Sequence, residues 1–402
     1  MASTLHTDPP LTRWRPHAAV LAFGAFAVGT DGFVVAGLLP PISASLHVSV
    51  AAAGQLVTVF AIAYAVFAPV LAALTASWPR RRVLVTALTV FAVGNAVTAL
   101  APGFGPILAS RVIAGAGAAM FTATASATAA MLAGERERGR AISIVMLGMT
   151  SSLVLGAPLG TVIGGLLNWR VTMWVVTALA LLAVPAIAWR LPPVHGSGNR
   201  GLRAFLAPLR DRRIIAVLAT TVVAFVGIYI PYTYISEIFA PAASGGSTLA
   251  VLLLAFGLAG TAGNLTAGRL ADRYGPRRVI IVVTLTLAAA FVLIPLGRDT
   301  LAAAVVAVVV AGFLSFSITA PQQHLMITMA GPGSGMVTSL YQSALYLAVS
   351  LSGALGAFGL EWQGAARLPW LAALLVLAAA VLTAVTARRS PSPLPAEARG
   401  RG

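Results

Sequence analysis

Long apolar stretches alternate with short polar stretches along almost the whole chain. Each apolar stretch has about 18–28 residues, enough for an α-helix to cross a hydrocarbon layer of ~30 Å. The stretches are residues 18–40, 50–74, 83–101, 105–131, 141–166, 170–190, 214–238, 248–270, 279–297, 300–328, 335–360 and 368–387. This pattern predicts an all-α polytopic membrane protein with twelve transmembrane helices.

One long polar connector, residues 191–213, divides the twelve spans into two sets of six. We expect one six-helix half at 18–190, a cytoplasmic linker, and a second six-helix half at 214–387. Polar residues 1–17 and 388–402 are expected to form cytoplasmic tails, the second of them disordered. An internal repeat supports the division, because residues 72–83 align without gaps with residues 268–279, between the second and third spans of each half.

The composition indicates that the whole chain is embedded in a lipid bilayer. Of the 402 residues, 59% are hydrophobic and only 9% are charged, whereas soluble domains contain about 25% charged residues. The shortage of charge extends along the chain, which excludes a soluble domain held by a single anchor.

The net charge of +16 comes from 26 arginines, and their placement predicts the orientation. With the N-terminus inside, 22 arginines lie in segments on the cytoplasmic side and 3 in loops on the outer side. Basic residues concentrate on the cytoplasmic side of membrane proteins. We therefore expect a cell-membrane protein with both termini cytoplasmic, and no nucleic-acid partner.

Several kinds of chemistry are excluded by residues that the chain lacks. Without Lys it has no phosphate-binding loop ending in Gly-Lys, which argues against a self-contained ATP-driven pump. Without Cys it has no disulfides or thiolate metal sites. No spacing of His or acidic residues is typical of a metal site. We expect no enzyme activity and no cofactor, with the proton as coupling ion.

Asp31 is the one acidic residue deep inside an apolar span, and Arg111 is the one basic residue there. Charged groups inside the membrane are costly and usually functional. Asp31 lies about 20 Å from the inner edge and Arg111 about 9 Å from the outer edge, so in a core of ~30 Å their depths coincide. The two side chains are expected to pair, either as a static structural pair or as a proton-coupling switch that opens during transport.

Five stretches of sequence resemble one known family. Residues 268–278 are similar to the loop signature of the major facilitator superfamily, and residues 108–119 are similar to its fourth-helix motif with Arg111 as the arginine. Residues 155–165 resemble the fifth-helix motif of its antiporters. Residues 29–40 and the ending at residues 168–170 resemble its drug:proton antiporters, which include chloramphenicol-resistance and arabinose-efflux-type permeases.

The resemblance covers about residues 18–387 and implies the major facilitator fold with drug and proton antiport. The residues that match its gating motifs are Gly156, Pro158, Gly160, Gly164, Gly268, Asp272, Arg273, Gly275, Arg277 and Arg278. Two positions depart from the family. Ala76 stands where the first basic loop usually has Asp, and Asp31 is one position away from the usual acid of the first helix, which allows a different partner.

Each gating motif has two physical interpretations. Asp272 can accept charge-assisted hydrogen bonds in one conformation and so hold a gate shut, or its loop is only a topology signal. The small residues of the fifth helix permit close helix contact, and Pro158 allows a bend. That helix is therefore expected to serve either packing alone or packing together with gating.

Aromatic residues and one further acid are candidates for the transport path. The expected cavity residues are Phe33, Tyr64, Tyr229, Tyr232, Tyr341 and Tyr346. Tyrosine rings with a polar tip suit either a semi-polar ligand or the bilayer interface. Glu237, near the outer end of the seventh span, either faces water or provides a second proton site.

The leading functional hypothesis is proton-coupled efflux of small, partly apolar compounds such as chloramphenicol-like drugs, by a monomer. A sugar or metabolite exporter or uniporter of the same fold is the alternative. A third possibility, a membrane-embedded enzyme or sensor, lacks support because the chain has no paired acids, metal ligands or sizeable soluble domain.

Overall fold

The computed structural model of the chain describes residues 14–194, 207–243, 245–330 and 334–388. All regular elements in these ranges are helices, and eleven helical segments are long and apolar enough to cross a membrane. One of the eleven, Phe104–Leu166, has 63 residues and is long enough for two crossings. The all-α architecture with twelve membrane spans is therefore confirmed.

The first half consists of six spans. Its elements are α1 (Arg15–Leu46), α2 (Val50–Leu74), α3 (Arg80–Leu100), α4 (Phe104–Ser151), the π-helical turn η1 (Ser152–Gly156), α5 (Ala157–Leu166) and α6 (Trp169–Arg190). Polar residues start two of these helices: Ser49 Oγ accepts the backbone N–H of Ala52, and Asn168 Oδ1 accepts that of Arg170.

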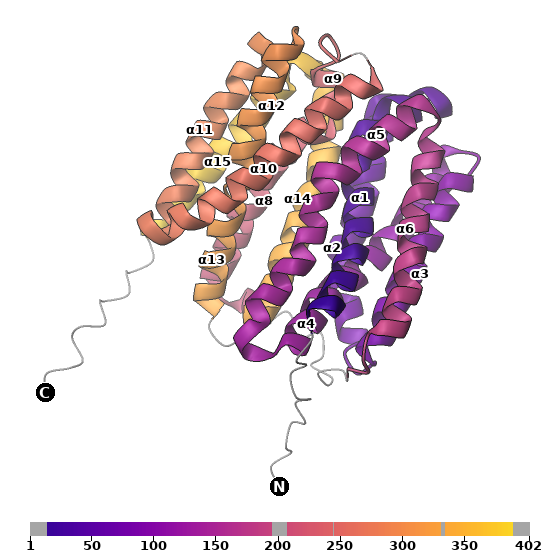
Figure 1. The fold of residues 1–402 in the computed structure, drawn as a ribbon. Coiled ribbons are helices and arrows are strands. Elements are labelled where there is room, and N and C mark those ends of the chain that lie inside the picture. Colours follow the sequence, from indigo (N-terminus) through magenta and orange to yellow (C-terminus); the bar gives the residue numbers. More distant parts are fainter. Residues whose placement is uncertain (1–13, 195–206, 244, 331–333, 389–402) are drawn as a thin grey trace, which may run out of the picture.

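The second half also consists of six spans. Its elements are η2 (Ala207–Arg210), α8 (Arg212–Thr233), α9 (Ile235–Ile238), α10 (Gly246–Tyr274), α11 (Pro276–Gly297), α12 (Leu301–Phe316), α13 (Thr319–Ala330), α14 (Ser334–Gln363), η4 (Ala365–Arg367) and α15 (Leu368–Arg388). Figure 1 shows the two halves as two bundles side by side, with α5 and α10 next to each other where the bundles meet.

Several boundaries differ from the sequence prediction, and the helix of the first span continues beyond residue 40 to Leu46. The expected loop at residues 132–140 is helical from Glu135 onwards, because the chain turns at a single residue, Gly134, with φ 70°. The seventh span ends at Thr233 and not at residue 238, and the short helix α9 follows. The tenth span is broken between α12 and α13, because Pro321 has no N–H to bond the carbonyl of Ser317.

Some predicted segments lie outside the described residues. These are most of the N-terminal tail, the C-terminal tail after Arg388, residues 195–206 of the linker with Arg200 and Arg203, and residues 331–333 of the uncharged loop.

The helix ends form two chemically different ends of the molecule. We call one the arginine-rich end, which carries Arg80–82, Arg136, Arg138, Arg140, Arg190, Arg212, Arg213, Arg269, Arg273, Arg277 and Arg278. The other is the arginine-poor end, with Arg170, Arg298 and Arg367. Exposed tryptophans accompany both ends, for example Trp189 at the first and Trp362 at the second. Such rings are typical of the two interfaces of a membrane.

The buried apolar core shows where the two halves meet. One large cluster contains residues of both halves, among them Ile42 and Trp169 of the first and Phe239 and Leu249 of the second, all near the arginine-poor end. Nearer the arginine-rich end, each half has a buried cluster of its own, and Tyr346 of the second half packs against the cluster of the first. The halves are therefore packed together at the arginine-poor end.

Candidate functional site

An ion pair lies at the centre of the first half. Arg111 Nη1 of α4 donates a hydrogen bond of 2.8 Å to Asp31 Oδ1 of α1, and the two side chains are 2% and 0% exposed. The two residues are 80 positions apart in the sequence. The structure thus brings together the two charged residues whose equal depth in the membrane predicted that they pair.

Two further residues position the guanidinium group of Arg111. Asn95 of α3 accepts a hydrogen bond of 3.2 Å from the same Nη1, while its own Nδ2 donates to the carbonyl of Phe91. The ring of Phe60 on α2 lies 4.6 Å from Arg111 Cζ, close enough for a cation–π interaction. Arg111 is therefore oriented by three helices at once.

The ion pair leaves hydrogen-bonding capacity unused. Asp31 Oδ2 and Arg111 Nε are buried and have no hydrogen-bond partner among the described residues. A carboxylate oxygen normally accepts several hydrogen bonds, so the pair is held by fewer contacts than its burial demands. One carboxylate oxygen of the pair is therefore open to a further hydrogen-bond donor.

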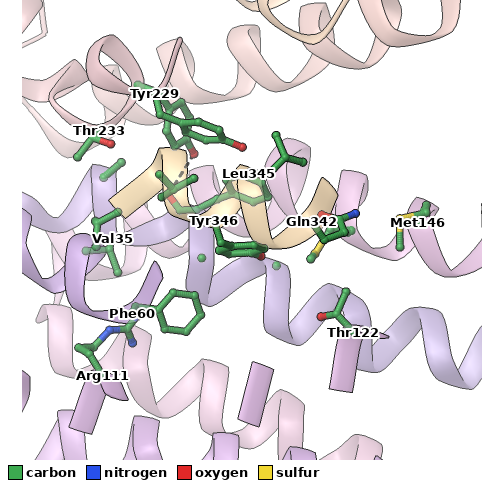
Figure 2. Close-up of a pocket in the computed structure, with 18 residues that line it drawn as sticks. Val35, Phe60, Arg111, Thr122, Met146, Tyr229, Thr233, Gln342, Leu345 and Tyr346 are labelled. Carbon is green, nitrogen blue, oxygen red and sulfur yellow. Dashed lines mark hydrogen bonds between the residues drawn. The ribbon is translucent and has the colours of Figure 1, made fainter. Parts of the chain in front are cut away.

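A cavity of about 140 Å³ lies between the halves and reaches Arg111 of this ion pair. Figure 2 shows Arg111 and Phe60 on one side of it, and Tyr229 and Tyr346 from the second half on the other. The lining residues are Gly29, Gly32, Phe33, Val35, Ala36, Val57, Phe60, Arg111, Thr122, Met146, Met149, Tyr229, Tyr232, Thr233, Gln342, Leu345, Tyr346 and Val349. Most of these side chains are apolar or aromatic.

Four of the six predicted cavity residues line this space: Phe33, Tyr229, Tyr232 and Tyr346. Tyr64 lies behind the wall, with its ring stacked on that of Tyr346. Tyr341 does not line the cavity; it packs in a separate cluster of the second half with Ile214, Leu218 and Met326.

An aromatic contact joins the halves beside the cavity. The Tyr232 hydroxyl of α8 donates a hydrogen bond of 3.0 Å to the carbonyl of Phe33 on α1. The rings of the same two residues meet edge to face, with centroids 6.0 Å apart. Since Phe33 lies two residues after Asp31 on α1, this contact connects α8 to the segment of α1 that carries the ion pair.

The glycines of the fifth span form a face that packs against α1. A Cβ at Gly156, Gly160 or Gly164 would collide with Thr30, Val34 or Leu38, which follow one another at four-residue intervals on α1. The π-helical turn η1 precedes Pro158, whose ring removes one helical hydrogen bond. These small residues allow the two helix backbones to approach closely.

The same part of the chain touches the second half. A Cβ built on Gly165 would lie 3.3 Å from Cα of Gly246 at the start of α10, and one built on Gly257 would lie 2.8 Å from the carbonyl oxygen of Leu153 in η1. The fifth-helix glycines therefore serve packing within the first half and also close contact between the halves, on the side of the arginine-poor end.

The second basic loop lies at the arginine-rich end, between α10 and α11. Gly275 makes the turn with φ 85°, and Arg273 lies over the ring of Tyr274, with Cζ 5.2 Å from its centroid. Asp272 is exposed and has no hydrogen bond or ion pair with the described residues. Gly268 has open space around its Cα, and Arg278 is exposed while Arg277 is half-buried.

Glu237 belongs to α9 at the arginine-poor end and is half-buried. Burial raises its pKa above the ordinary value of 4.5. Its side chain does not line the central cavity and has no ion pair with any residue in the described ranges. The structure thus places Glu237 apart from Asp31 and Arg111.

Sequence reasoning missed Asn95, Phe60 and Gln342. Asn95 carries a detectable signal, because it is a lone amide inside an otherwise apolar span. Phe60 and Gln342 carry no comparable signal, since many aromatic and polar residues of the spans do not reach the cavity. In the described part of the chain, no three His, Asp or Glu side chains gather in a way that suits a metal ion.

A family model and individual proteins of known sequence both match most of this chain. A sequence model of the Major Facilitator Superfamily matches residues 21–242 and again 213–402. The uncharacterised MFS-type transporter YbcL of Bacillus subtilis is 32% identical over 374 residues, covering 92% of this chain and 96% of YbcL. A chloramphenicol resistance protein of Streptomyces lividans is 33% identical over 304 residues, 74% of this chain and 77% of that protein. A chloramphenicol efflux pump of Mycobacterium tuberculosis is 31% identical over 376 residues, 89% and 90% of the two chains.

Solved structures share the fold at lower identity. The crystal structure of a D-xylose-proton symporter superposes with a TM-score of 0.74 at 17% identity, over 92% of this chain and 97% of that one. A bacterial homolog of the human lysosomal transporter Spinster gives a TM-score of 0.75 at 18% identity, over 94% and 98% of the two chains.

Proposed function

This chain belongs to the major facilitator superfamily of membrane transporters, and we propose that it exports small, partly apolar compounds in exchange for protons. The observation that carries the proposal is the buried Asp31–Arg111 ion pair, whose Arg111 lines the central cavity. The proton is the coupling ion in this proposal, the protein works as a monomer without a cofactor, and it catalyses no covalent reaction.

The ion pair provides a route from substrate binding to proton binding. In the described state the carboxylate of Asp31 is paired with the guanidinium group of Arg111. When a bound compound or a helix shift separates the pair, the carboxylate is left alone in apolar surroundings, where the charged form is disfavoured. Asp31 then takes up a proton at Oδ2, the oxygen without a partner, and releases it when Arg111 returns.

The lining of the cavity supports neutral or weakly polar aromatic compounds as substrates. Phe33, Phe60, Tyr229, Tyr232 and Tyr346 offer ring faces and edges, and Gln342 offers one amide that can donate and accept. Chloramphenicol is a compound of this general kind, and it is the drug in the names of two relatives.

Close contact at one end supports alternating access. The halves are packed together at the arginine-poor end through Gly165 and Gly246, while Asp272 at the arginine-rich end has no partner in the described structure. In the proposed cycle, contacts at the arginine-poor end break and Asp272 gains partners that close the opposite end. The lone Asp272 then acts as a latch in that second state.

The arginine-rich end is assigned to the cytoplasm in this proposal. The reason is the 22-to-3 distribution of arginines together with the preference of basic residues for the cytoplasmic side. With this orientation both termini are cytoplasmic, the protein lies in the cell membrane, and the central cavity is closed toward the outside in the state described here.

A sugar or metabolite transporter is the second candidate, because a sugar symporter shares the fold. A sugar site needs several hydrogen-bonding groups to replace the water around the hydroxyls. The cavity lining offers Thr122, Thr233 and Gln342 as uncharged polar groups apart from the tyrosine hydroxyls. The apolar character of the remaining wall favours the drug exporter.

Everted membrane vesicles with an imposed proton gradient test the proposal. Addition of a transported compound should release protons from the acidic lumen and cause the compound to accumulate there. A panel of phenicols, dyes, cationic drugs and sugars would identify the substrate class, both in vesicles and as resistance of cells that express the protein. Equilibration of a sugar without proton movement would favour the alternative, and absence of any flux would reject both.

A further inference from the structure

A second cavity, of about 340 Å³, lies within the second half at the arginine-rich end. Helices α8, α11, α13 and α15 form its walls, and none of its lining residues belongs to the central cavity. Its position at the end of the helices places it at the level of a membrane–water interface, separate from the central cavity.

Three arginines stand around this cavity. Arg212 and Arg213 begin α8 and are exposed, and half-buried Arg277 lies in the first turn of α11. The N-terminal, positive ends of α8 and α11 therefore lie beside the cavity, together with three arginines. Asp211, the neighbouring acidic residue in the sequence, caps the N-terminus of α8: its Oδ1 accepts a hydrogen bond from the backbone N–H of Arg213.

The deeper wall of the cavity contains an unsatisfied amide. Gln322 of α13 is 1% exposed, and neither its Nε2 nor its Oε1 has a hydrogen-bond partner among the described residues. Two buried threonines, Thr220 and Thr383, line the same cavity with hydroxyls that donate to carbonyls of their own helices. A buried amide without partners is rare in proteins, and here it points to a ligand that can both donate and accept hydrogen bonds.

We propose that this second cavity binds a hydroxylated phosphate ester, with the phosphate between the three arginines and a hydroxyl group at Gln322. Guanidinium groups bind phosphate oxygens through pairs of parallel hydrogen bonds. Two sources have this chemistry: the headgroup of an acidic phospholipid such as phosphatidylglycerol, and a free ester such as glycerol 3-phosphate. Basic pockets between membrane helices at this level are suited to lipid headgroups.

The test measures thermal unfolding of the purified protein as each compound is added, with zwitterionic phosphatidylethanolamine as the reference lipid. A ligand that binds only the folded protein raises its Tm in a concentration-dependent way. Phosphatidylglycerol is expected to raise the Tm and phosphatidylethanolamine to leave it unchanged. A rise with glycerol 3-phosphate as well would assign the site to the phosphate ester itself, and a rise with the lipid alone would assign it to the headgroup in the membrane.

Matched variants identify the site. R212Q/R213Q should weaken the apparent affinity by about tenfold or more, the effect of losing one charge-assisted hydrogen bond. R81Q/R82Q removes two exposed arginines from the first turn of α3 at the same end, far from the cavity lining, and should change nothing. Q322L should also weaken binding, whereas Q323L, the same substitution one residue on and outside the lining, should not.

The proposal is overturned if neither ligand raises the Tm, or if R81Q/R82Q loses as much affinity as R212Q/R213Q, because the effect would then be general attraction to basic residues. If Q322L does not fold, R212Q/R213Q decides the question, because both of its substitutions are at exposed positions. The assay contains neither a transported compound nor a proton gradient, so its result is independent of the efflux function.

Discussion

Tyr64 of α2 and Tyr346 of α14 stack face to face across the two halves, with ring centroids 3.4 Å apart and an angle of 15° between the ring planes. The outer face of this pair forms part of the cavity wall, because Tyr346 lines the cavity. One contact between the halves therefore also contributes to the proposed substrate site, which couples the position of α14 to what the cavity holds.

Replacing Tyr346 tests this relationship. Tyr346→Ala removes an aromatic pair worth about 0.5–1.5 kcal/mol beyond its buried area, and it enlarges the cavity. We expect efflux of aromatic compounds to fall several-fold in transport assays, while Tyr346→Phe, which keeps the ring, stays close to the wild type. Unchanged efflux by Tyr346→Ala would remove Tyr346 from the proposed substrate site.

Arg111→Ala should reduce both stability and transport. The substitution leaves Asp31 buried without its partner, and breaking a buried pair in this way costs about 3–5 kcal/mol. Arg111→Lys should restore only part of the loss, because an ammonium cannot reproduce the planar donor geometry that meets both Asp31 and Asn95.

Asn95→Ala is the matched control for the same network, since it removes one hydrogen bond from Arg111 and keeps the ion pair. It should cost about 1.5–3 kcal/mol in thermal unfolding, less than Arg111→Ala. If all three variants unfold like the wild type, the network contributes nothing to stability.

The sequence predicted the ion pair but not the complete network. A charge inside an apolar span is so costly that it needs a partner of opposite charge, and Asp31 and Arg111 are the charged residues deep in the spans. Counting residues from the span ends placed the two at one depth. Asn95 is neutral, and a neutral amide can bond to its own helix, as Asn95 also does with Phe91. Its contact with Arg111 depends on how α3 rotates against α4, which hydrophobic spacing does not determine.

The same limit applies to the helix boundaries and the cavity. Span lengths follow from apolar runs and were predictable, whereas the break between α12 and α13 follows from one residue, Pro321, inside such a run. Tyr341 and Tyr346 lie on one helix, five positions apart, yet Tyr341 packs inside the second half and Tyr346 lines the cavity. Composition alone does not distinguish a buried tyrosine from a cavity tyrosine.

Glu237 gives a prediction about pH. Burial raises its pKa in the folded protein above 4.5, so the folded state favours the protonated form. The resulting stability is fully present below the unfolded pKa and is lost as the pH rises through the folded pKa. The Tm of the wild type should therefore fall relative to that of Glu237→Gln as the pH rises from about 4 to 7. Glu361→Gln, a change at an exposed acid of α14, serves as the control, and parallel curves for all three proteins would contradict the prediction.

Gly165→Val should open the arginine-poor end. A Cβ at this position already lies 3.3 Å from Cα of Gly246, so a branched side chain forces α5 and α10 apart. Paired probes on cysteines introduced at Leu74 of α2 and Ser339 of α14 would report a shorter distance at the arginine-rich end, since the native chain has no Cys. Gly139→Val is the control, because nothing lies within 4 Å of a Cβ there. If Gly139→Val changes the probe distance as much as Gly165→Val does, the change does not come from the contact between Gly165 and Gly246.

Asp272→Ala should act in the opposite direction. Asp272 has no partner among the described residues, so its removal should weaken only the state in which the arginine-rich end is closed. A bias of ~1.4 kcal/mol changes the ratio of two states tenfold, which the same probes would detect as a larger population with the longer distance. An unchanged distribution with intact transport would reduce this loop to a signal for membrane orientation.

Proton release from everted vesicles that contain Asp31→Asn tests the central claim most directly. The amide keeps the shape of the carboxylate and can still accept a hydrogen bond from Arg111, but it cannot bind and release a proton. The proposed mechanism predicts that the variant inserts, folds and equilibrates a transported compound down its concentration gradient, with no proton release and no accumulation against the gradient. Normal proton-driven accumulation by Asp31→Asn would show that the coupling proton binds elsewhere.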